Sequence, residues 1–288
     1  MIAGPPLPFP MISRFLFSKL AAKSDDLSFW EHAEVLRVHL LRIILVWLVF
    51  SIAAFFFKDI LFGRIIMGPM QPEFPTYGWI CSAGQMLGYD SFCFEGLDIQ
   101  LINIDLAGQF RWHMIISLVA GVVFTFPFAA WQLWLFVKPA LKPEEKKQSG
   151  GLIGVISLLF LLGLVFGYFI VLPLTIVFLA NYQLSELIIN QITISSYIST
   201  STLLPLSTGL VFELPVLVYF LARIGLLTAS YLRRNRRYSV VIILVLAGII
   251  TPSTDIFSQV LVALPLYVLY EISISVARRA ERLSEAIT

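Results

Sequence analysis

Long stretches without a charged residue alternate along this chain with short clusters of basic residues. A helix needs about 20 apolar residues to cross a bilayer, so uncharged runs of that order predict membrane spans. The predicted spans are centred on Ile43–Phe57, Met114–Val137, a segment within Leu152–Ala180, about Ser199–Ala222, Tyr238–Ile250 and about Ile256–Val276. The pattern therefore predicts an all-α polytopic membrane protein with six transmembrane helices.

The composition points the same way. The 288 residues are 58% hydrophobic and 13% charged, with a mean hydropathy of +0.87. A soluble domain has about 45–50% apolar and roughly 25% charged residues. These values exclude a soluble enzyme, a disordered chain and a nucleic-acid binder, and they place most of the chain in a lipid bilayer.

The distribution of Lys and Arg predicts the orientation. If the six spans are correct, 17 of the 20 basic residues fall on one side of the membrane. They lie in residues 14–42, 138–147, 223–237 and 278–282, whereas the other side has Lys58, Arg64 and Arg111. Because cytoplasmic loops carry the excess of Lys and Arg, both termini are predicted to be cytoplasmic.

The polar segments divide the chain into parts. We expect an N-terminal cytoplasmic leader (1–27), a membrane domain (28–279) with an exterior loop (58–111), and a cytoplasmic tail (280–288). The first ten residues include four prolines and no signal-peptide pattern, so they are either a leader or precede a natural start at Met11. Cys81 and Cys93 share the exterior loop, where an oxidising compartment favours a disulfide over two buried thiols.

Two features inside the spans are unusual. The fifth predicted span has 13 residues, which rise about 20 Å against a hydrocarbon core of about 30 Å. This span is either sheltered by other helices or lies in a thinned bilayer. Prolines within spans predict bent helices and a cupped shape; they are Pro127, Pro173, Pro205, Pro215 and Pro265.

Glu213 interrupts the fourth predicted span. A carboxylate there costs several kcal/mol, which makes it a candidate functional group. It could form a docking or gating site, bond the backbone or Gln132 at a kink, or carry protons in a secondary transporter. The two halves of the chain show no inverted repeat, which disfavours the transporter.

Other chemistry is sparse. Acidic residues stand among the cytoplasmic bases at Glu31, Glu34, Glu144 and Glu145. They are either ordinary surface charge or acceptors for a cationic ligand, for which the arginine fork is the best match. The sequence contains no HExxH, GxSxG or P-loop motif, and we therefore expect neither an enzyme nor a metal or cofactor site.

Five motifs in order resemble the TatC family, the multi-spanning receptor subunit of the twin-arginine protein translocase. They are Ser28–Arg37; Trp131–Leu141 followed by Glu144–Lys147; Phe212–Val216; Arg233–Tyr238; and Thr251–Gln259, followed by Pro265 and Tyr270-Glu271. The resemblance covers roughly Ser28 to Arg279 and implies a six-helix, cupped TatC-like fold.

The resemblance also implies a function. Members of the family bind twin-arginine signal peptides of folded precursors at the cytoplasmic face; Glu34, Arg37, Phe136 and Glu145 match that site. The first motif departs from the family pattern, because Val35 stands where Glu is usual and Glu34 lies one place earlier. One residue is about 100° of helix rotation, so Glu34 is expected to point elsewhere unless the helix start adapts.

Further implied roles lie within and outside the membrane. Glu213, with Gln132 and Gln259 as further intramembrane polar groups, is associated with binding single-span TatA/TatB-type partners. Pro69 and Asp255 match exterior functional positions. The resemblance implies a homo-oligomer within a receptor complex, in the bacterial inner membrane, that uses the proton-motive force to export folded proteins.

Overall fold

The computed structural model describes residues 29–86, 88, 100–140, 151–183, 185, 190–251 and 256–285. Within the membrane domain the helices are α2 (Phe29–Phe56), α4 (Gly108–Val137), α6 (Leu152–Phe166), α7 (Leu172–Asn181), α8 (Ile194–Val211), α9 (Leu214–Arg223), α10 (Ala229–Arg234), α11 (Arg236–Ile250) and α12 (Ile256–Glu285). A π-helical segment, η5 (Gly167–Val171), joins α6 to α7, and the 3-10 turn η4 (Lys138–Ala140) follows α4.

Five helical stretches of the described residues are long and apolar enough to cross a bilayer: His32–Phe56, Gly108–Val137, Leu152–Asn181, Ile194–Arg223 and Ser258–Glu281. They confirm the prediction of an all-α multi-span membrane protein. The predicted fifth span corresponds to α11, which has 15 residues and therefore rises about 22 Å. The last helix continues to Glu285, into the segment that the sequence separates as a tail.

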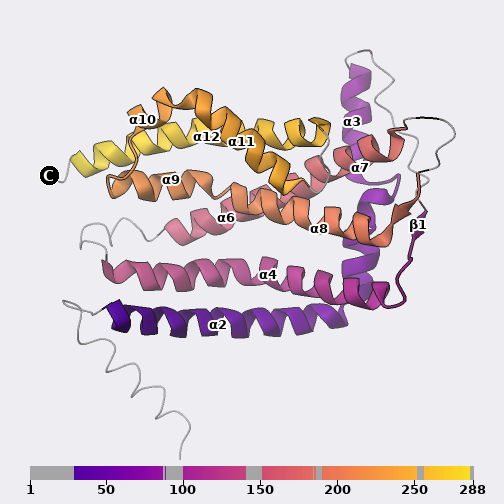
Figure 1. The fold of residues 1–288 in the computed structure, drawn as a ribbon, viewed down its shortest axis with the longest axis horizontal. Coiled ribbons are helices and arrows are strands. Elements are labelled where there is room, and N and C mark those ends of the chain that lie inside the picture. Colours follow the sequence, from indigo (N-terminus) through magenta and orange to yellow (C-terminus); the bar gives the residue numbers. More distant parts are fainter. Residues whose placement is uncertain are drawn as a thin grey trace, which may run out of the picture.

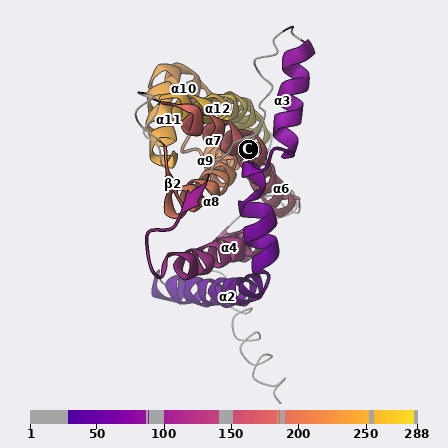
Figure 2. The same cartoon turned by 90° about the vertical axis from the view of Figure 1, so that its right-hand side faces the viewer.

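The helices lie roughly side by side (Figure 1). α2 packs along α4, α6 along α8, α9 along α12, and α11 along α12. The start of α2, the end of α4, α10 and the C-terminal end of α12 lie at one end of the molecule, which we call the terminal end. α3 (Pro75–Met86) and the strands lie at the opposite end, the loop end (Figures 1 and 2).

The loop end is built from short elements. The π-helical segment η1 (Asp59–Ile66) and the 3-10 turn η2 (Gly68–Met70) follow α2 and lead to α3. β1 (Leu101–Ile102) and β2 (Ile192–Thr193) form a parallel pair with Leu101 opposite Ile192. This pair joins the segment before α4 to the segment before α8, so it fixes two connections that are distant in the sequence.

Two spans are interrupted. In the third, the π-helical η5 continues directly into α7, and Pro173 lies in the first turn of α7. Pro173 has no N–H to donate to the Phe169 oxygen four residues earlier, and this oxygen accepts a bond from the Thr76 hydroxyl. In the fourth, α8 ends at Val211, and α9 begins with Pro215 in its first turn. Phe212 and Glu213 form the turn between the two helices. The third and fourth spans therefore deviate from regular helices near Pro173 and Pro215, whereas Pro127, Pro205 and Pro265 lie within α4, α8 and α12.

Candidate functional site

An aromatic and polar contact joins α2 to α4 at the terminal end. The Phe136 ring of α4 lies 4.4 Å from the His32 ring and 6.4 Å from the His39 ring, between centroids. One turn earlier on α4, Gln132 is buried, and its Oε1 lies 2.6 Å from His39 Nδ1. Because an amide oxygen only accepts, the His39 N–H at Nδ1 donates this bond. Phe136 is therefore held by both histidines of α2.

Glu34 and Arg37 occupy the exposed side of the same helix end. Arg37 Nη1 lies 3.6 Å from Glu34 Oε1, and the side chains are 69% and 65% exposed respectively. Exposed pairs of this kind are worth about 0–1 kcal/mol, so Glu34 is available to another cation. Val35, the next residue, is only partly exposed, so Glu34 has the more outward-facing side chain of the two.

Several predicted site residues lie outside the described part of the chain. Glu145 is in the segment that follows α4, and Asp255 is in the segment between α11 and α12. Cys81 of α3 is disulfide-bonded, and Cys93, the other cysteine of the sequence, also lies outside the described residues. The roles of Glu145 and Asp255 and the pairing of Cys93 stay predictions.

Glu213 sits in the turn that interrupts the fourth span. Its backbone oxygen accepts bonds from the N–H groups of Val216 and Leu217, each at 3.0 Å. Its side-chain Oε1 is buried and has no hydrogen-bond partner among the described residues. Gln132, which the sequence offers as one partner at a kink, bonds His39 instead. The intramembrane carboxylate thus retains an unsatisfied acceptor.

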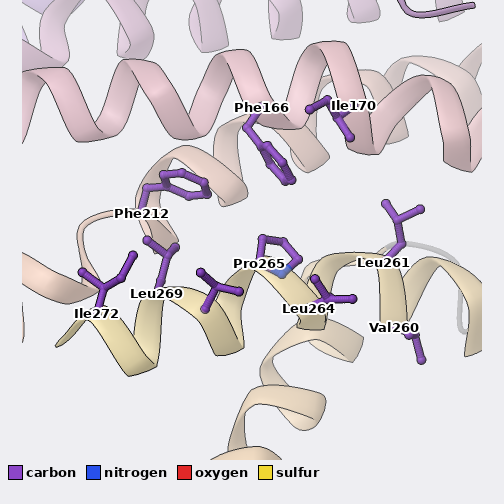
Figure 3. Close-up of a pocket in the computed structure, with 10 residues that line it drawn as sticks. Phe166, Ile170, Phe212, Val260, Leu261, Leu264, Pro265, Leu269 and Ile272 are labelled. Atoms are coloured by element: carbon purple, nitrogen blue, oxygen red, sulfur yellow. The ribbon is translucent and has the colours of Figure 1, made fainter. Parts of the chain in front are cut away.

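A groove of about 660 Å³ lies beside this turn (Figure 3). Phe166, Ile170 and Phe212 form one wall. The facing wall is the outer surface of α12 around its proline, with Val260, Leu261, Leu264, Pro265, Val268, Leu269 and Ile272. Every lining side chain is apolar, and Phe212 directly precedes Glu213. The groove therefore suits an apolar helix or chain rather than a polar solute.

Gln259 has a structural contact. Its Nε2 donates to the backbone oxygen of Leu244 at 2.8 Å, across the α11–α12 interface. A Cβ on Gly248 would lie 3.2 Å from this nitrogen, so the amide also needs space there. Gln259 therefore fastens the short helix α11 to α12.

Pro69 lies at the loop end, buried in η2. The Tyr77 hydroxyl donates to the Pro69 oxygen at 2.5 Å, and burial raises the pKa of Tyr77 to about 12. Two further tyrosines donate to carbonyls just before it: Tyr168 to Ile65 at 2.7 Å and Tyr197 to Ile66 at 2.6 Å. The three tyrosines hold the backbone around Pro69 from three separate helical segments.

Sequence reasoning missed these tyrosines and the two histidines around Phe136. A tyrosine or histidine near a span end is common in membrane proteins and gives no signal of its partner. The described residues include no group of three His, Cys, Asp or Glu side chains that could hold a metal ion.

The fold and these contacts define a class: a helical, multi-span membrane protein with interrupted spans and polar groups at helix ends and breaks. A family model for the Sec-independent protein translocase protein (TatC) matches residues 31–265. The TatC proteins of Blattabacterium and Aquifex aeolicus are 35% and 33% identical to the chain. The alignments cover 88% of this chain and 96% of the first protein, and 89% and 97% for the second.

Solved structures agree with these relatives. A crystal structure described as the twin arginine translocase receptor TatC superposes with a TM-score of 0.68 at 33% identity, covering 87% of this chain and 99% of that one. The chain belongs to the TatC family. It is a receptor subunit of the twin-arginine translocase and a multi-pass membrane protein, and it is not an enzyme.

Proposed function

We propose that the terminal end of α2 and α4 binds the twin-arginine motif of signal peptides on folded precursors. The supporting observation is that Glu34 is exposed on the helix end that packs against Phe136. The segment with Glu145 directly follows α4, so a second carboxylate is available close in sequence to Phe136.

Two carboxylates suit two arginines. A guanidinium donates two parallel bonds to one carboxylate, and a charge-assisted bond is worth about 1.5–3 kcal/mol. Lysine lacks the fork, so a twin-lysine peptide should bind more weakly. Arg37 holds Glu34 only loosely, at 3.6 Å, and an incoming arginine would replace it as the partner. Phe136 would then contact the part of the peptide next to the arginine pair.

The test compares the affinities of a twin-arginine peptide and its twin-lysine version for the purified chain. We expect Glu145→Lys and Glu34→Lys each to weaken twin-arginine binding by about tenfold or more. Glu73→Lys is the matched control, because Glu73 is an exposed acid at the loop end. Equal affinities for both peptides, or equal effects of all three variants, would refute this site.

The groove beside Glu213 is the proposed docking place for the transmembrane helix of a single-span TatA/TatB-type partner. Its lining is apolar, and the buried Oε1 of Glu213 offers an unsatisfied acceptor next to it. A photo-crosslinker at Leu264, a groove residue that is 65% exposed, should capture such a partner. Val155 on α6, exposed but outside the groove, is the control. Equal capture at both positions would argue against docking here.

The cellular setting is part of the proposal. We place the chain in the bacterial inner membrane with both termini cytoplasmic, in a homo-oligomeric receptor complex driven by the proton-motive force. The first described residues and the end of α12 share one end of the molecule, in agreement with this topology. Labelling of single cysteines at the exposed positions Ala33 and Arg279 tests it. Both should react only when the cytoplasmic side is open.

A further inference from the structure

A second pocket lies at the terminal end, between α10 and the last turns of α12. Its volume is about 480 Å³, and its lining consists of Ala229, Ser230, Arg233, Arg234, Arg278 and Glu281. Three of these six side chains are guanidinium groups, and all three are exposed. The pocket differs from the proposed peptide site, which lies on α2 and α4.

The positive charge of this pocket is not neutralised by the described residues. Between residues 223 and 281, the described side chains include seven arginines but only two acids, Glu271 and Glu281. Glu271 pairs with Arg236 at 2.7 Å, outside the pocket. Glu281 lines the pocket, but its Oε1 accepts the N–H of Ala229 at 2.7 Å.

The guanidinium N–H groups of the pocket arginines are therefore not used in ion pairs with the described acids. No described acid forms an ion pair with Arg233, Arg234 or Arg278. This contrasts with Arg236, which pairs with Glu271, and with Arg237, which lies over the Tyr238 ring at 5.1 Å. Three arginines facing one pocket without an acid partner can bind an anion.

The surroundings place this anion at a membrane surface. The candidate membrane span of α12 runs from Ser258 to Glu281, and its last turn carries the lining residues Arg278 and Glu281. The turn before α10 exposes Ile224 and Leu226, at 61% and 71%, and α10 exposes Tyr231. Apolar and tyrosine side chains beside a basic pocket at the end of a span are typical of the boundary between hydrocarbon and water.

We propose that this pocket binds the phosphate of an anionic phospholipid headgroup. Arg233, Arg234 and Arg278 would donate to the phosphate oxygens, as guanidinium forks do to phosphate. Basic pockets between membrane helices are known to suit such headgroups. A free phosphate offers the same oxygens but no acyl chains for Leu226 and Tyr231 to contact. The exposed apolar side chains therefore favour a lipid.

The test measures lipid binding by native mass spectrometry of the full chain released from micelles. The probes are phosphatidylglycerol and phosphatidylcholine. The pocket variant is Arg234→Gln/Arg278→Gln. The control variant is Arg237→Gln/Arg279→Gln, which removes the same charge from the same end but replaces none of the lining residues. We expect wild type to prefer phosphatidylglycerol, the pocket variant to lose about tenfold in affinity for it, and the control to change by less than about twofold.

The other results would overturn the proposal. Equal losses of phosphatidylglycerol affinity in both double variants would mean that the terminal end attracts anionic lipids by its overall charge alone. Displacement of the lipid by inorganic phosphate would make this a free-phosphate site. If the pocket variant fails to fold, Arg278→Lys keeps the charge and loses the fork. A smaller but measurable loss is then expected, and no loss would contradict the proposed recognition.

Discussion

The Nδ1 of His39 donates to the Oε1 of Gln132 at 2.6 Å, and this bond joins α2 to α4 one turn from Phe136. Gln132 is buried, so water cannot replace the bond. The bond fixes how far α2 and α4 are shifted along each other near Glu34, which lies on α2, and Phe136, which lies on α4. A side-chain bond between membrane helices contributes about 0.6 kcal/mol on average and up to about 1.7.

The first prediction tests this bond. Gln132→Leu should lower the stability by about 1 kcal/mol, because it leaves the His39 N–H without its acceptor. The double variant His39→Leu/Gln132→Leu should lose less than the sum of the single variants, since neither polar group is left unsatisfied. Thermal unfolding in detergent gives the four values of the cycle. Additive losses would show that the two side chains are not coupled.

The second prediction concerns the contact between the third and fourth spans. A Cβ on Gly167 would overlap Thr208 and come within 2.8 Å of Pro205 Cα. Gly167→Ala should therefore force the two spans apart and cost about 1–3 kcal/mol. Gly154→Ala is the matched control, because no atom lies within 4 Å of its Cβ position. The measurement is the unfolding temperature of each variant and of wild type under the same conditions. Equal temperatures for Gly167→Ala and Gly154→Ala would contradict the close approach of the two spans.

The third prediction is a pH dependence at the loop end. The pKa of Tyr77 rises from 10.0 to about 12 in the folded protein. A raised pKa means that the stabilisation is complete below pH 10 and is lost as the pH rises towards about 12. At neutral pH, wild type should have a higher melting temperature than Tyr77→Phe, because the variant loses the hydrogen bond to the Pro69 oxygen.

The gap between the two melting temperatures should narrow between pH 10 and about 12, because over this range Tyr77 ionises in the unfolded chain while it is still protonated in the folded protein. Tyr182→Phe is the control, because this side chain is 60% exposed. A gap that stays constant over this range would show that the hydroxyl of Tyr77 is not the group responsible.

The fourth prediction concerns the cysteines. Cys81 is disulfide-bonded, and Cys93 is the other cysteine of the sequence. A maleimide should label neither position in the unfolded, unreduced chain and both after reduction. Labelling of both cysteines without a reductant would exclude a disulfide between Cys81 and Cys93 and would place the loop in a reducing compartment.

Much of this fold follows from the sequence, because lipid imposes a simple rule on the chain. A span must be apolar and must satisfy its own backbone, so an uncharged run is almost sufficient to locate a helix. The predicted end of the second span at Val137 coincides with the end of α4, and the predicted Tyr238–Ile250 differs from α11 by two residues at its start.

The site was less accessible to prediction, because its partners are not sequence features. Gln259 bonds a backbone oxygen, and every residue has one. Gln132 bonds His39, which is 93 positions away, and no spacing rule links the two. Glu213 was found because a carboxylate within an apolar run is unusual in itself. Whether it had a partner depended on how the turn between α8 and α9 packs.

The fifth prediction concerns the bilayer beside α11. Ile243 and Ala247 are buried, but Val241, Val245 and Ile249 are 57–74% exposed. Within the described part of the chain, the rest of the protein therefore does not shelter this helix. A helix of 15 residues rises about 22 Å, so lipids beside it must thin to cover both ends.

Spin labels measure this directly. A label at Ile249, in the last turn of α11, should lie near the headgroups if the bilayer is thinned, and deep in the hydrocarbon if it is not. Leu162 in the third span is exposed and belongs to a stretch of 30 residues, so its label should be deep in both cases. We expect Ile249 to be accessible to a water-soluble relaxation agent while Leu162 is not. If both labels are inaccessible, the surrounding lipids keep their full thickness, and α11 must then be covered by another subunit.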